Sequence, residues 1–356
     1  MRALVKQGSR VRLITTKPLA PEARQWLAGV EHILLTVPDL QPERLENLGF
    51  FANRYCRYWG IKHAEISVVS EYLKKSSADA LVATGPDCLP LLSACRGLKR
   101  VWYAADNPLL FELSNRGLRS PKTVLLMAAY QWTLSSAADI TWVVSEQDRH
   151  WGRMSGGKQV DWIPNGVDFD YYSPIASEIE KETCIFWGRL DFAPNILALD
   201  YFLDHVWPTL VTMRPECKFI VCGCATNLEI RRKLHETYNV QFREDLPDLR
   251  ETISRAAVAV FPLVSGAGVK NKVLEAAAMG KAIVASSRCK FGLAGVGIPL
   301  SIANSAEDWV SSIIQIWDSD SKRQALEAET LSWVRANHHW SQSAIAALNS
   351  IQRNQR

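Results

Sequence analysis

Residues 262–286 read PLVSGAGVKNKVLEAAAMGKAIVAS, and this stretch decides the fold class. It begins as the end of a buried strand, passes through a turn with Gly266 and Gly268, and continues as a helix to about Met279. A second apolar strand follows from Ala282 to Ala285. Strands that alternate with helices in this way predict an α/β protein with parallel sheets.

The start of this helix carries two lysines where acidic residues are usual. A helix N-terminus holds about half a positive charge, so Asp or Glu normally stabilises the first turn. Lys270 and Lys272 are compatible with the helix N-terminus if an anion binds there, and phosphate is the anion that most often does. Glu275 follows on the same helix, where its carboxylate can accept hydrogen bonds from sugar hydroxyls. The pattern predicts a nucleotide-sugar site.

Each of these residues also has an ordinary structural explanation. The lysines could lie on a solvated helix face, and Glu275 could be an interior helical acid or part of a surface salt bridge. The two glycines could be plain turn residues. The glycine turn, the flanking strands and the position at a helix start together favour the site.

The composition is that of a globular protein with two domains. The chain has 356 residues, of which 47% are hydrophobic, enough for two ordinary cores. The net charge of +4 is small and its lysines and arginines are dispersed, which argues against a nucleic-acid partner. Because the sequence has no apolar run of membrane-spanning length and no apolar leader, we expect a soluble, cytoplasmic protein.

The cysteines and histidines do not predict a metal site. The eight cysteines include no CxxC pair, and the closest pair, Cys222 and Cys224, falls at the end of an apparent core strand. We expect reduced, mostly buried cysteines. The seven histidines show neither HxxxH nor HExxH spacing, so we expect no metal and no other cofactor.

Strand-like and helical patterns alternate along the chain. The strands predicted before the boundary are Val11–Thr15, Ile33–Val37, Ala80–Ala83, Arg100–Ala104 and Ile140–Val144, and the helices are His63–Lys75, Cys88–Cys95 and Lys122–Ser136. After it, the strands are Cys184–Trp187, Phe219–Val221, Val240–Phe242, Val258–Phe261 and Ile283–Ala285, and the helices are Asn195–Met213, Leu228–Thr237, Leu249–Ala256 and three more at the end. Turn residues gather around Trp162–Pro174 and charged residues follow at Glu178–Glu182, which predicts the domain boundary there.

The first residues are unusual. Met1–Thr15 read as the tail of a helix, a C-capping Gly8 and then a strand. A doubly wound domain normally begins with a strand and a ligand-facing loop before its first helix. We therefore expect the N-terminal domain to lack its first strand, either because the chain is truncated or because its start is placed too late.

Five segments, in order from Ile140 to about Ser286, resemble the family-four glycosyltransferases of the GT-B fold. Together they are specific for the family, though not for a substrate. The segments are Val143–Arg149, at the end of the first domain; Ile163–Asp168 with Tyr171–Pro174, the interdomain signature; Phe186–Asp191, the glycine-arginine loop; Val240–Arg250, before the donor site; and Gly266–Ser286, the donor helix and its following strand.

The resemblance implies a retaining transfer of a sugar from a nucleotide-diphosphate donor to an acceptor hydroxyl, without a required metal. Arg189, Lys270 and Lys272 match positions that hold the diphosphate, and Glu275 matches a glutamate that contacts the ribose. Gly188, Gly266 and Gly268 match the glycines of the two donor loops. Fixed cations accelerate such a reaction because the leaving group gains negative charge as the glycosidic bond breaks.

Two positions, Ala267 and Asp106, bear on the contacts to the sugar and to the acceptor. The first glutamate of the family's usual pair falls at Ala267, which leaves the contacts to the donor sugar open. Asp106 matches an acidic position of the family and follows a strand, where open sheets bind ligands. It could also be a helix N-cap, because Asn and Pro follow it. We predict Arg189, Lys272 and Asp106 as catalytic residues.

We therefore predict the GT-B fold, with two Rossmann-like domains facing a cleft. Residues 1–170 form the N-terminal acceptor domain, residues 176–338 form the nucleotide-sugar donor domain, and the helix in residues 339–356 returns to the first domain. The expected function is glycosyl transfer in polysaccharide, glycolipid or glycan assembly. One alternative is a catalytically impaired remnant that binds nucleotide or a partner; a nucleotide-sugar epimerase or a phosphorolytic enzyme of the same fold is another.

A basic and aromatic segment adds an expectation about partners. Its residues could contact anionic lipid headgroups at the inner face of a membrane that holds a lipid-linked acceptor. The alternative is an ordinary basic helix pair with an aromatic packing face. The basic residues are Arg54, Arg57, Lys62, His63, Lys74 and Lys75, interleaved with Phe50, Phe51, Tyr55, Tyr58 and Trp59.

Overall fold

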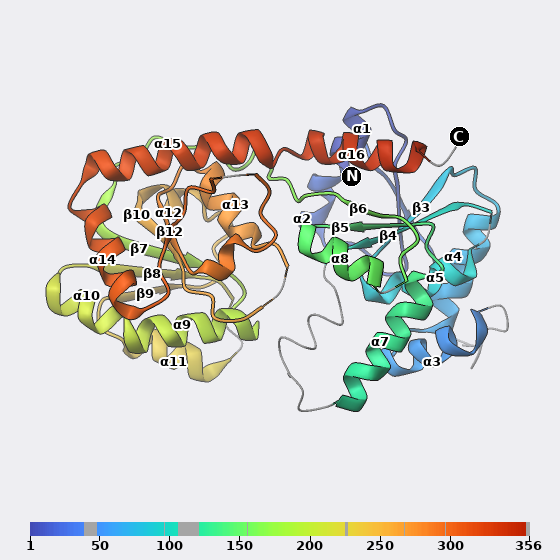
Figure 1. Cartoon of the computed structure of the whole chain (residues 1–356), viewed down its shortest axis with the longest axis horizontal. Helices are drawn as coiled ribbons and strands as arrows, with labels where there is room; N and C mark the ends of the chain where they lie inside the picture. The colour runs from blue at the N-terminus through green and yellow to red at the C-terminus, as the bar shows by residue number, and fades with distance from the viewer. Residues whose placement is uncertain are drawn as a thin grey trace. The chain divides into compact units, whose positions relative to one another are not determined.

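The chain forms two compact units (Figure 1). Unit 1 comprises Met1–Pro164 and Trp340–Arg356, and unit 2 comprises Asn165–His339. The passage between them at residues 164 and 165 lies within the interdomain signature of the sequence. The structure, a computed structural model, describes residues 1–38, 48–95, 97–105, 121–154, 156–224, 227–266, 268–295 and 297–353.

Unit 2 is built on one six-stranded parallel sheet in the order β12-β11-β10-β7-β8-β9. The first strand of the unit, β7, lies near the centre, and the chain moves outward first on one side of it and then on the other. This doubly wound arrangement places a ligand crevice at the carboxyl ends of the central strands β7 and β10. The strands are β7 (Glu180–Trp187), β8 (Lys218–Cys222), β9 (Val240–Arg243), β10 (Ala256–Phe261), β11 (Ile283–Ala285) and β12 (Ser301–Ile302).

Helices cover both faces of this sheet. Figure 1 shows α9 and α11 on one side of the strands and α13 and α15 on the other. Every residue of β10 is buried, as expected for a parallel strand that is covered on both faces. The helices are α9 (Ala193–His205), α10 (Trp207–Met213), α11 (Leu228–Glu236), α12 (Arg250–Arg255), α13 (Asn271–Ala278), the 3₁₀ turn η5 (Ser287–Lys290), α14 (Ala306–Trp317) and α15 (Asp320–Asn337).

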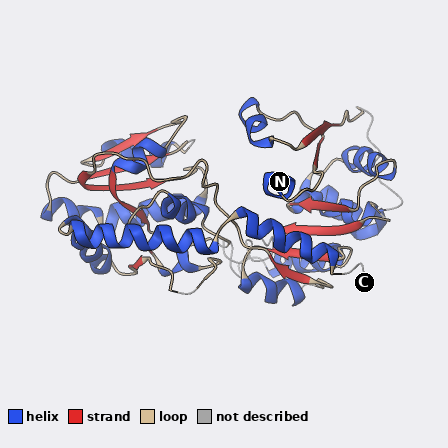
Figure 2. Ribbon diagram, turned by 90° about the horizontal axis from the view of Figure 1, so that it is seen from above, coloured by secondary structure: helices blue, strands red, loops and turns tan. Residues whose placement is uncertain are grey.

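The described part of unit 1 contains two separate parallel sheets. Four strands pair in the order β3-β4-β5-β6, whereas β1 and β2 pair with each other and lie apart from the other strands (Figure 2). All four residues of β5 are buried, but no residue of β1 or β2 is. The strands are β1 (Arg12–Thr15), β2 (Glu31–Leu34), β3 (Ala80–Thr84), β4 (Lys99–Ala104), β5 (Ile140–Val143) and β6 (Val160–Trp162).

Apolar helix faces supply most of the core around the larger sheet of unit 1. Residues of α3, α4, α5 and α7 form one buried cluster with β3 and β4. Ile14 of β1 packs against this cluster, which attaches the smaller sheet to the unit. The helices are α1 (Arg2–Lys6), α2 (Pro21–Arg24), η1 (Gln25–Leu27), α3 (Gly49–Trp59), α4 (His63–Lys74), η3 (Pro86–Cys88), α5 (Leu89–Ala94), α7 (Pro121–Ser135) and α8 (Glu146–Met154).

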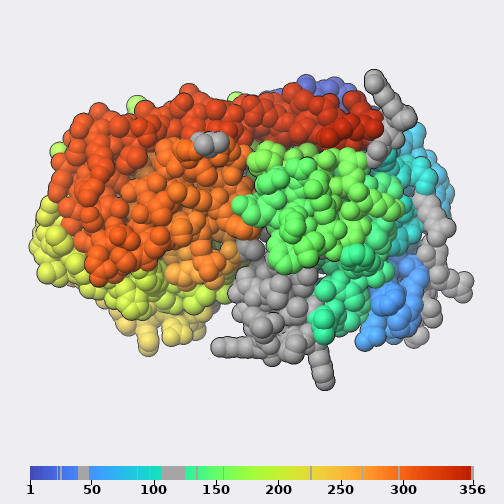
Figure 3. Space-filling model, viewed as in Figure 1, coloured from blue at the N-terminus to red at the C-terminus, as the bar shows by residue number. Residues whose placement is uncertain are grey.

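The last helix, α16 (Trp340–Gln352), belongs to unit 1. It packs against α1 and β5, and Figure 3 shows its red atoms lying along the green atoms of the segment that contains β5 and α8. The indole Nε1 of Trp142 donates to Ser350 Oγ at 2.9 Å, and Ser350 Oγ donates to Asp161 Oδ2 at 2.5 Å. A helix that is distant in the sequence therefore completes the hydrogen bonds of side chains on β5 and β6.

Most predicted elements are confirmed, but the helix predicted over Asn195–Met213 is wrong because it is two helices. The chain breaks at Val206, between α9 and α10. Pro208 lies at the second position of α10 and has no N–H group to donate back into α9. A proline within an apolar helical pattern was the signal for this break.

Two strand boundaries also differ from the prediction. The strand predicted over Ile33–Val37 is β2, which begins two residues earlier and ends at Leu34. Strand β7 begins at Glu180, inside the charged run assigned to the domain boundary. Glu180 pairs there with Arg255 and Lys218 at the solvated amino end of the sheet, so its charge is compatible with a strand.

The cysteines are free, and all except Cys88 and Cys224 are buried, which largely confirms the prediction. The helices described here include none that is both long and apolar enough to cross a membrane.

Replacing Ser350 by alanine should destabilise unit 1. The buried indole N–H of Trp142 would lose its acceptor, and an unsatisfied buried polar group costs about 1–3 kcal/mol. The half-buried carboxylate of Asp161 would lose one of its donors. Chemical denaturation would measure the change. Asn349→Ala, an exposed position of the same helix, is the control and should change stability by less than about 0.5 kcal/mol. Equal stability of Ser350→Ala and wild type would contradict this account.

Candidate functional site

The glycine loop between β10 and α13 adopts a conformation that suits glycine. Gly266 has φ +96° and Gly268 has φ +78°, values that other residues rarely adopt. Lys270 Nζ donates to the carbonyl oxygens of both, at 3.2 and 3.0 Å. Lys270 therefore closes the loop that precedes the helix by binding two of its carbonyl oxygens.

Lys272 is the central cation of the site. Its half-buried side chain lies over the ring of Phe186, with Nζ 4.3 Å from the ring centroid, and Nζ donates to Asn195 Oδ1 at 2.7 Å. Among the described residues it forms no salt bridge with a carboxylate. Burial lowers the pKa of Lys272 to about 8. A desolvated ammonium with a neutral partner can gain strongly from a bound anion.

Gly188 allows the loop after β7 to lie close to the side chains of Lys272 and Asn195. A Cβ at this position would lie 2.7 Å from Lys272 Nζ and 2.9 Å from Asn195 Nδ2, closer than real Cβ atoms approach such neighbours. Its φ of +152° is also uncommon for residues with a side chain. The predicted loop glycine is therefore needed for space beside the cation.

Asn195 joins the two loops, and the sequence interpretation missed it. The side chain is buried in the first turn of α9, where Nδ2 donates to the carbonyl oxygen of Arg189 at 2.7 Å while Oδ1 accepts from Lys272. One amide therefore fixes both the glycine-arginine loop and the cation. A polar residue between Pro194 and the apolar run of α9 was the available signal.

Arg189 has a different environment. Its side chain is 79% exposed and pairs with Asp191, with Nη2 2.6 Å from Oδ2. Exposed ion pairs contribute little to stability. Arg189 thus lies on the loop beside the site, and its exposed guanidinium makes two hydrogen bonds to the carboxylate of Asp191.

Glu275 lies on α13 behind Lys272 and already has two protein partners. Trp187 Nε1 donates to Glu275 Oε2 at 2.9 Å, and the hydroxyl of Tyr172 also hydrogen-bonds to the carboxylate. Burial raises the pKa of Glu275, whereas these bonds and the nearby Lys272 act in the opposite direction. Tyr172 belongs to the interdomain signature, so the signature contacts the predicted site within unit 2.

The structure therefore brings together Gly188, Gly266, Gly268, Lys270, Lys272 and Glu275 at the carboxyl ends of β7 and β10, with Arg189 at the exposed edge. A further bond joins the signature to the helix: Asn165 Nδ2 donates to Asn271 Oδ1 at 3.0 Å. Asp106 and Ala267 lie outside the described residues.

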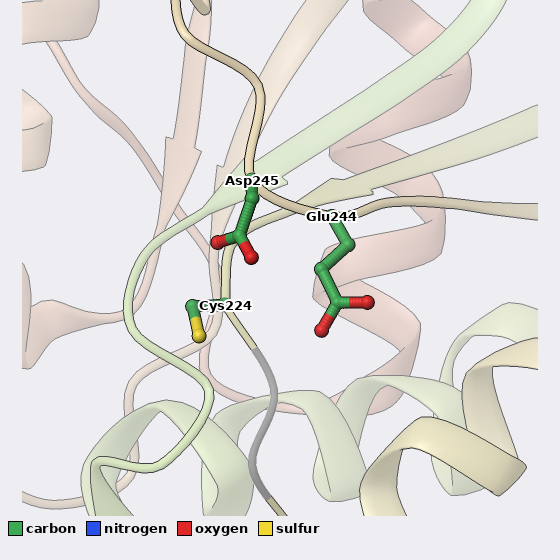
Figure 4. Close-up of side chains that lie close together, drawn as sticks. All are labelled: Cys224, Glu244 and Asp245. Atoms are coloured by element: carbon green, nitrogen blue, oxygen red, sulfur yellow. The ribbon is translucent and has the colours of Figure 1, made fainter.

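A cysteine and two acids lie close together at the neighbouring strand ends (Figure 4). Ligand atoms of Cys224, Glu244 and Asp245 lie within 4.8 Å of one another, and all three residues are exposed. The pKa of the Cys224 thiol is raised by Asp245, which disfavours the thiolate that binds metals, and Glu244 pairs with Arg231. We assign no metal to this cluster.

The fold and the site define a two-domain protein of the GT-B class. The chain is similar over 99% of its length to sucrose-phosphate synthase from Thermosynechococcus elongatus (TM-score 0.69, 15% identity, 90% of that chain). It is equally similar to Anabaena HepE in complex with UDP and glucose (TM-score 0.69, 13% identity, 99% of this chain and 94% of that chain). No curated protein sequence matches the chain.

Residues 181–319 match the family model described as "Glycosyl transferases group 1". The chain thus has the GT-B fold and carries a group 1 glycosyl transferase domain in unit 2. The matched segment contains every residue that the site draws from β7, α9, β10 and α13.

Replacing Gly188 by alanine should weaken anion binding at the site, because the new methyl group would displace the Lys272 ammonium or the Asn195 amide. Loss of one charge-assisted hydrogen bond corresponds to about 1–3 kcal/mol of binding free energy. Calorimetric titration with pyrophosphate measures it. Gly297→Ala is the control, since Gly297 also has a positive φ but has no neighbour within 4 Å of the added carbon. Equal affinity of the two variants would remove Gly188 from the site.

Proposed function

We propose that the chain transfers a sugar from a nucleotide-diphosphate sugar to an acceptor hydroxyl, with retention of anomeric configuration. Lys272 carries this proposal: a desolvated ammonium without a carboxylate partner in the described residues lies at the start of α13, beside a glycine loop. A diphosphate fits this arrangement because it can accept from Lys272 and from the backbone N–H groups of the helix N-terminus.

The same groups would stabilise the departing nucleoside diphosphate. Negative charge grows on the leaving oxygen as the glycosidic bond breaks, so Lys272 gains more in the transition state than in the ground state. Arg189 would exchange its exposed bond to Asp191 for one to the diphosphate. Because protein cations supply this charge, the proposed reaction requires no metal.

Glu275 would bind the ribose of the donor. Its carboxylate has about four acceptor positions, and Trp187 and Tyr172 occupy two of them. The remaining positions can accept from ribose hydroxyls, while the two protein donors keep the carboxylate in place.

The donor and the acceptor are proposed by analogy with similar structures. HepE was solved with UDP and glucose and also with UDP-glucose. The structure of a variant of S. aureus TarM, to which 81% of this chain is similar, contains UDP and alpha-GlcNAc-glycerol. We place acceptor binding in unit 1, with Asp106 as a candidate contact, in polysaccharide, glycolipid or glycan assembly.

A thermal-shift panel with UDP, GDP, ADP and CDP tests the donor site. A ligand at about 100 times its dissociation constant should stabilise the chain by about 2.7 kcal/mol. Lys272→Ala should abolish most of this shift, because the diphosphate loses a charge-assisted bond. Lys218→Ala is the control, since Lys218 begins β8 at the opposite, amino end of the sheet.

The same panel on Glu275→Gln separates ribose from phosphate binding: the shift from a nucleoside diphosphate should fall more than the shift from pyrophosphate. A shift from no nucleotide on folded wild-type protein would refute the donor site. Binding without transfer to any acceptor would favour the non-catalytic alternative, and NMR of the first product would test retention.

The affinity for a nucleoside diphosphate should fall as the pH rises above about 8. The free-state pKa of Lys272 is lowered to about 8, and the bound anion favours the protonated form. Binding above this pH must therefore take up a proton, and affinity should decrease by up to about tenfold per pH unit. Calorimetry in buffers of different ionisation enthalpy would detect the proton.

Lys272→Met should remove this pH dependence, whereas Lys281→Met should retain it. Burial lowers the pKa of Lys281 to about 8 as well, but its ammonium lies near Glu327 of α15 and donates to Ser254 O, away from the glycine loops. A pH profile that is identical in wild type and Lys272→Met would contradict the role of Lys272.

A further inference from the structure

Helix α3 has an exposed face without acidic residues, and it lies at the surface of unit 1 beside α7 (Figure 1). The opposite face is part of the core: Ala52, Tyr55 and Cys56 are buried, and the ring of Tyr55 contacts Tyr130 of α7 with centroids 5.4 Å apart. The helix is thus anchored to the unit through one side and presents the other to solvent.

The exposed side combines aromatic and cationic groups. Phe50, Phe51, Tyr58 and Trp59 are 57%, 47%, 49% and 37% exposed, and Phe50 with Phe51 and Tyr58 with Trp59 form edge-to-face ring pairs. Such a group of large apolar side chains is unusual on a surface that contacts only water. We call Phe50, Phe51, Arg54, Arg57, Tyr58 and Trp59 the α3 face.

The charges of the α3 face are of one sign. Arg54 and Arg57 are exposed and form no ion pair with any residue that the structure describes, and Lys62 follows in the exposed loop before α4. The rest of the basic segment behaves differently: His63 and Tyr55 are buried, and Lys74 pairs with Glu71. The exposed arginines therefore remain available to an anionic partner.

From this geometry we propose that unit 1 docks on an anionic lipid surface through the α3 face. Aromatic rings prefer the boundary between headgroups and acyl chains, and arginines at the same level bind lipid phosphates. Rings and arginines on one face of a single helix meet both conditions at once. This proposal goes beyond the proposed function and does not depend on it, because no residue of the donor site takes part.

Co-sedimentation of the full chain with vesicles tests the proposal. Vesicles of phosphatidylcholine with about 30 mol% phosphatidylglycerol should bind the protein at about 0.1 M salt, and pure phosphatidylcholine vesicles should bind it at least about tenfold less. Binding should weaken as salt is added. Arg54→Glu/Arg57→Glu should lower the partition coefficient for anionic vesicles at least about tenfold. Phe50→Ser/Phe51→Ser should lower the same coefficient both at about 0.1 M salt and after more salt is added.

Matched variants elsewhere on the surface control for charge and apolarity. Arg232→Glu/Arg335→Glu makes the same change in net charge on exposed positions of α11 and α15, and Leu228→Ser/Met213→Ser removes exposed apolar groups from unit 2. Both should bind the anionic vesicles as wild type does. The unfolding midpoint and nucleotide binding of each variant show whether it has folded.

Three outcomes would overturn the proposal. Wild-type protein could fail to sediment with anionic vesicles at low salt, or the arginine variant could bind as well as wild type. The α3 face could instead join two copies of the chain, in which case size-exclusion chromatography without vesicles would show a dimer that Phe50→Ser/Phe51→Ser converts to a monomer, with no binding to vesicles.

Discussion

The desolvated ammonium of Lys272 constrains most of the structure around it. A cation that is partly removed from water is costly unless it is hydrogen-bonded, and here an amide and an aromatic face take the place of a carboxylate. A carboxylate partner would neutralise Lys272 and leave less to gain from a bound anion. Asn195 instead supplies a neutral hydrogen bond that keeps the charge in position, while burial lowers the pKa of Lys272.

The loops around this cation are shaped by how closely backbone segments must approach. A Cβ at Gly188 would collide with the ammonium, and a Cβ at Gly223, after β8, would lie only 2.0 Å from the carbonyl oxygen of Gly188. The carboxyl ends of β7 and β8 are thus packed backbone against backbone. The side chains of the site come from the helices that cover the sheet: Asn195 from α9, and Lys272 and Glu275 from α13.

Much of the fold followed from local patterns. Gly266 and Gly268 marked a turn, the apolar runs of β8, β10 and β11 marked core strands, and ordered segments indicated the family. The errors occurred where a local pattern was compatible with two structures. The apolar periodicity through Val206 continues across a helix break, and the charged residues around Glu180 suit the solvated start of a strand as well as a linker.

The sequence by itself determined the parallel α/β architecture, the glycine loop and the pair of lysines at the start of α13, because these depend on residues close together in the chain. The tertiary structure decided which of them act together. Lys272 meets Asn195 across 77 positions, and Trp142 meets Ser350 across 208. It also separated Lys270, which closes its own loop, from Lys272, and it left Arg54 and Arg57 exposed while burying Tyr55. The spacing of residue types along the chain does not predict these hydrogen-bond partners or these differences in burial. They depend on which surfaces pack together once the sheet has formed.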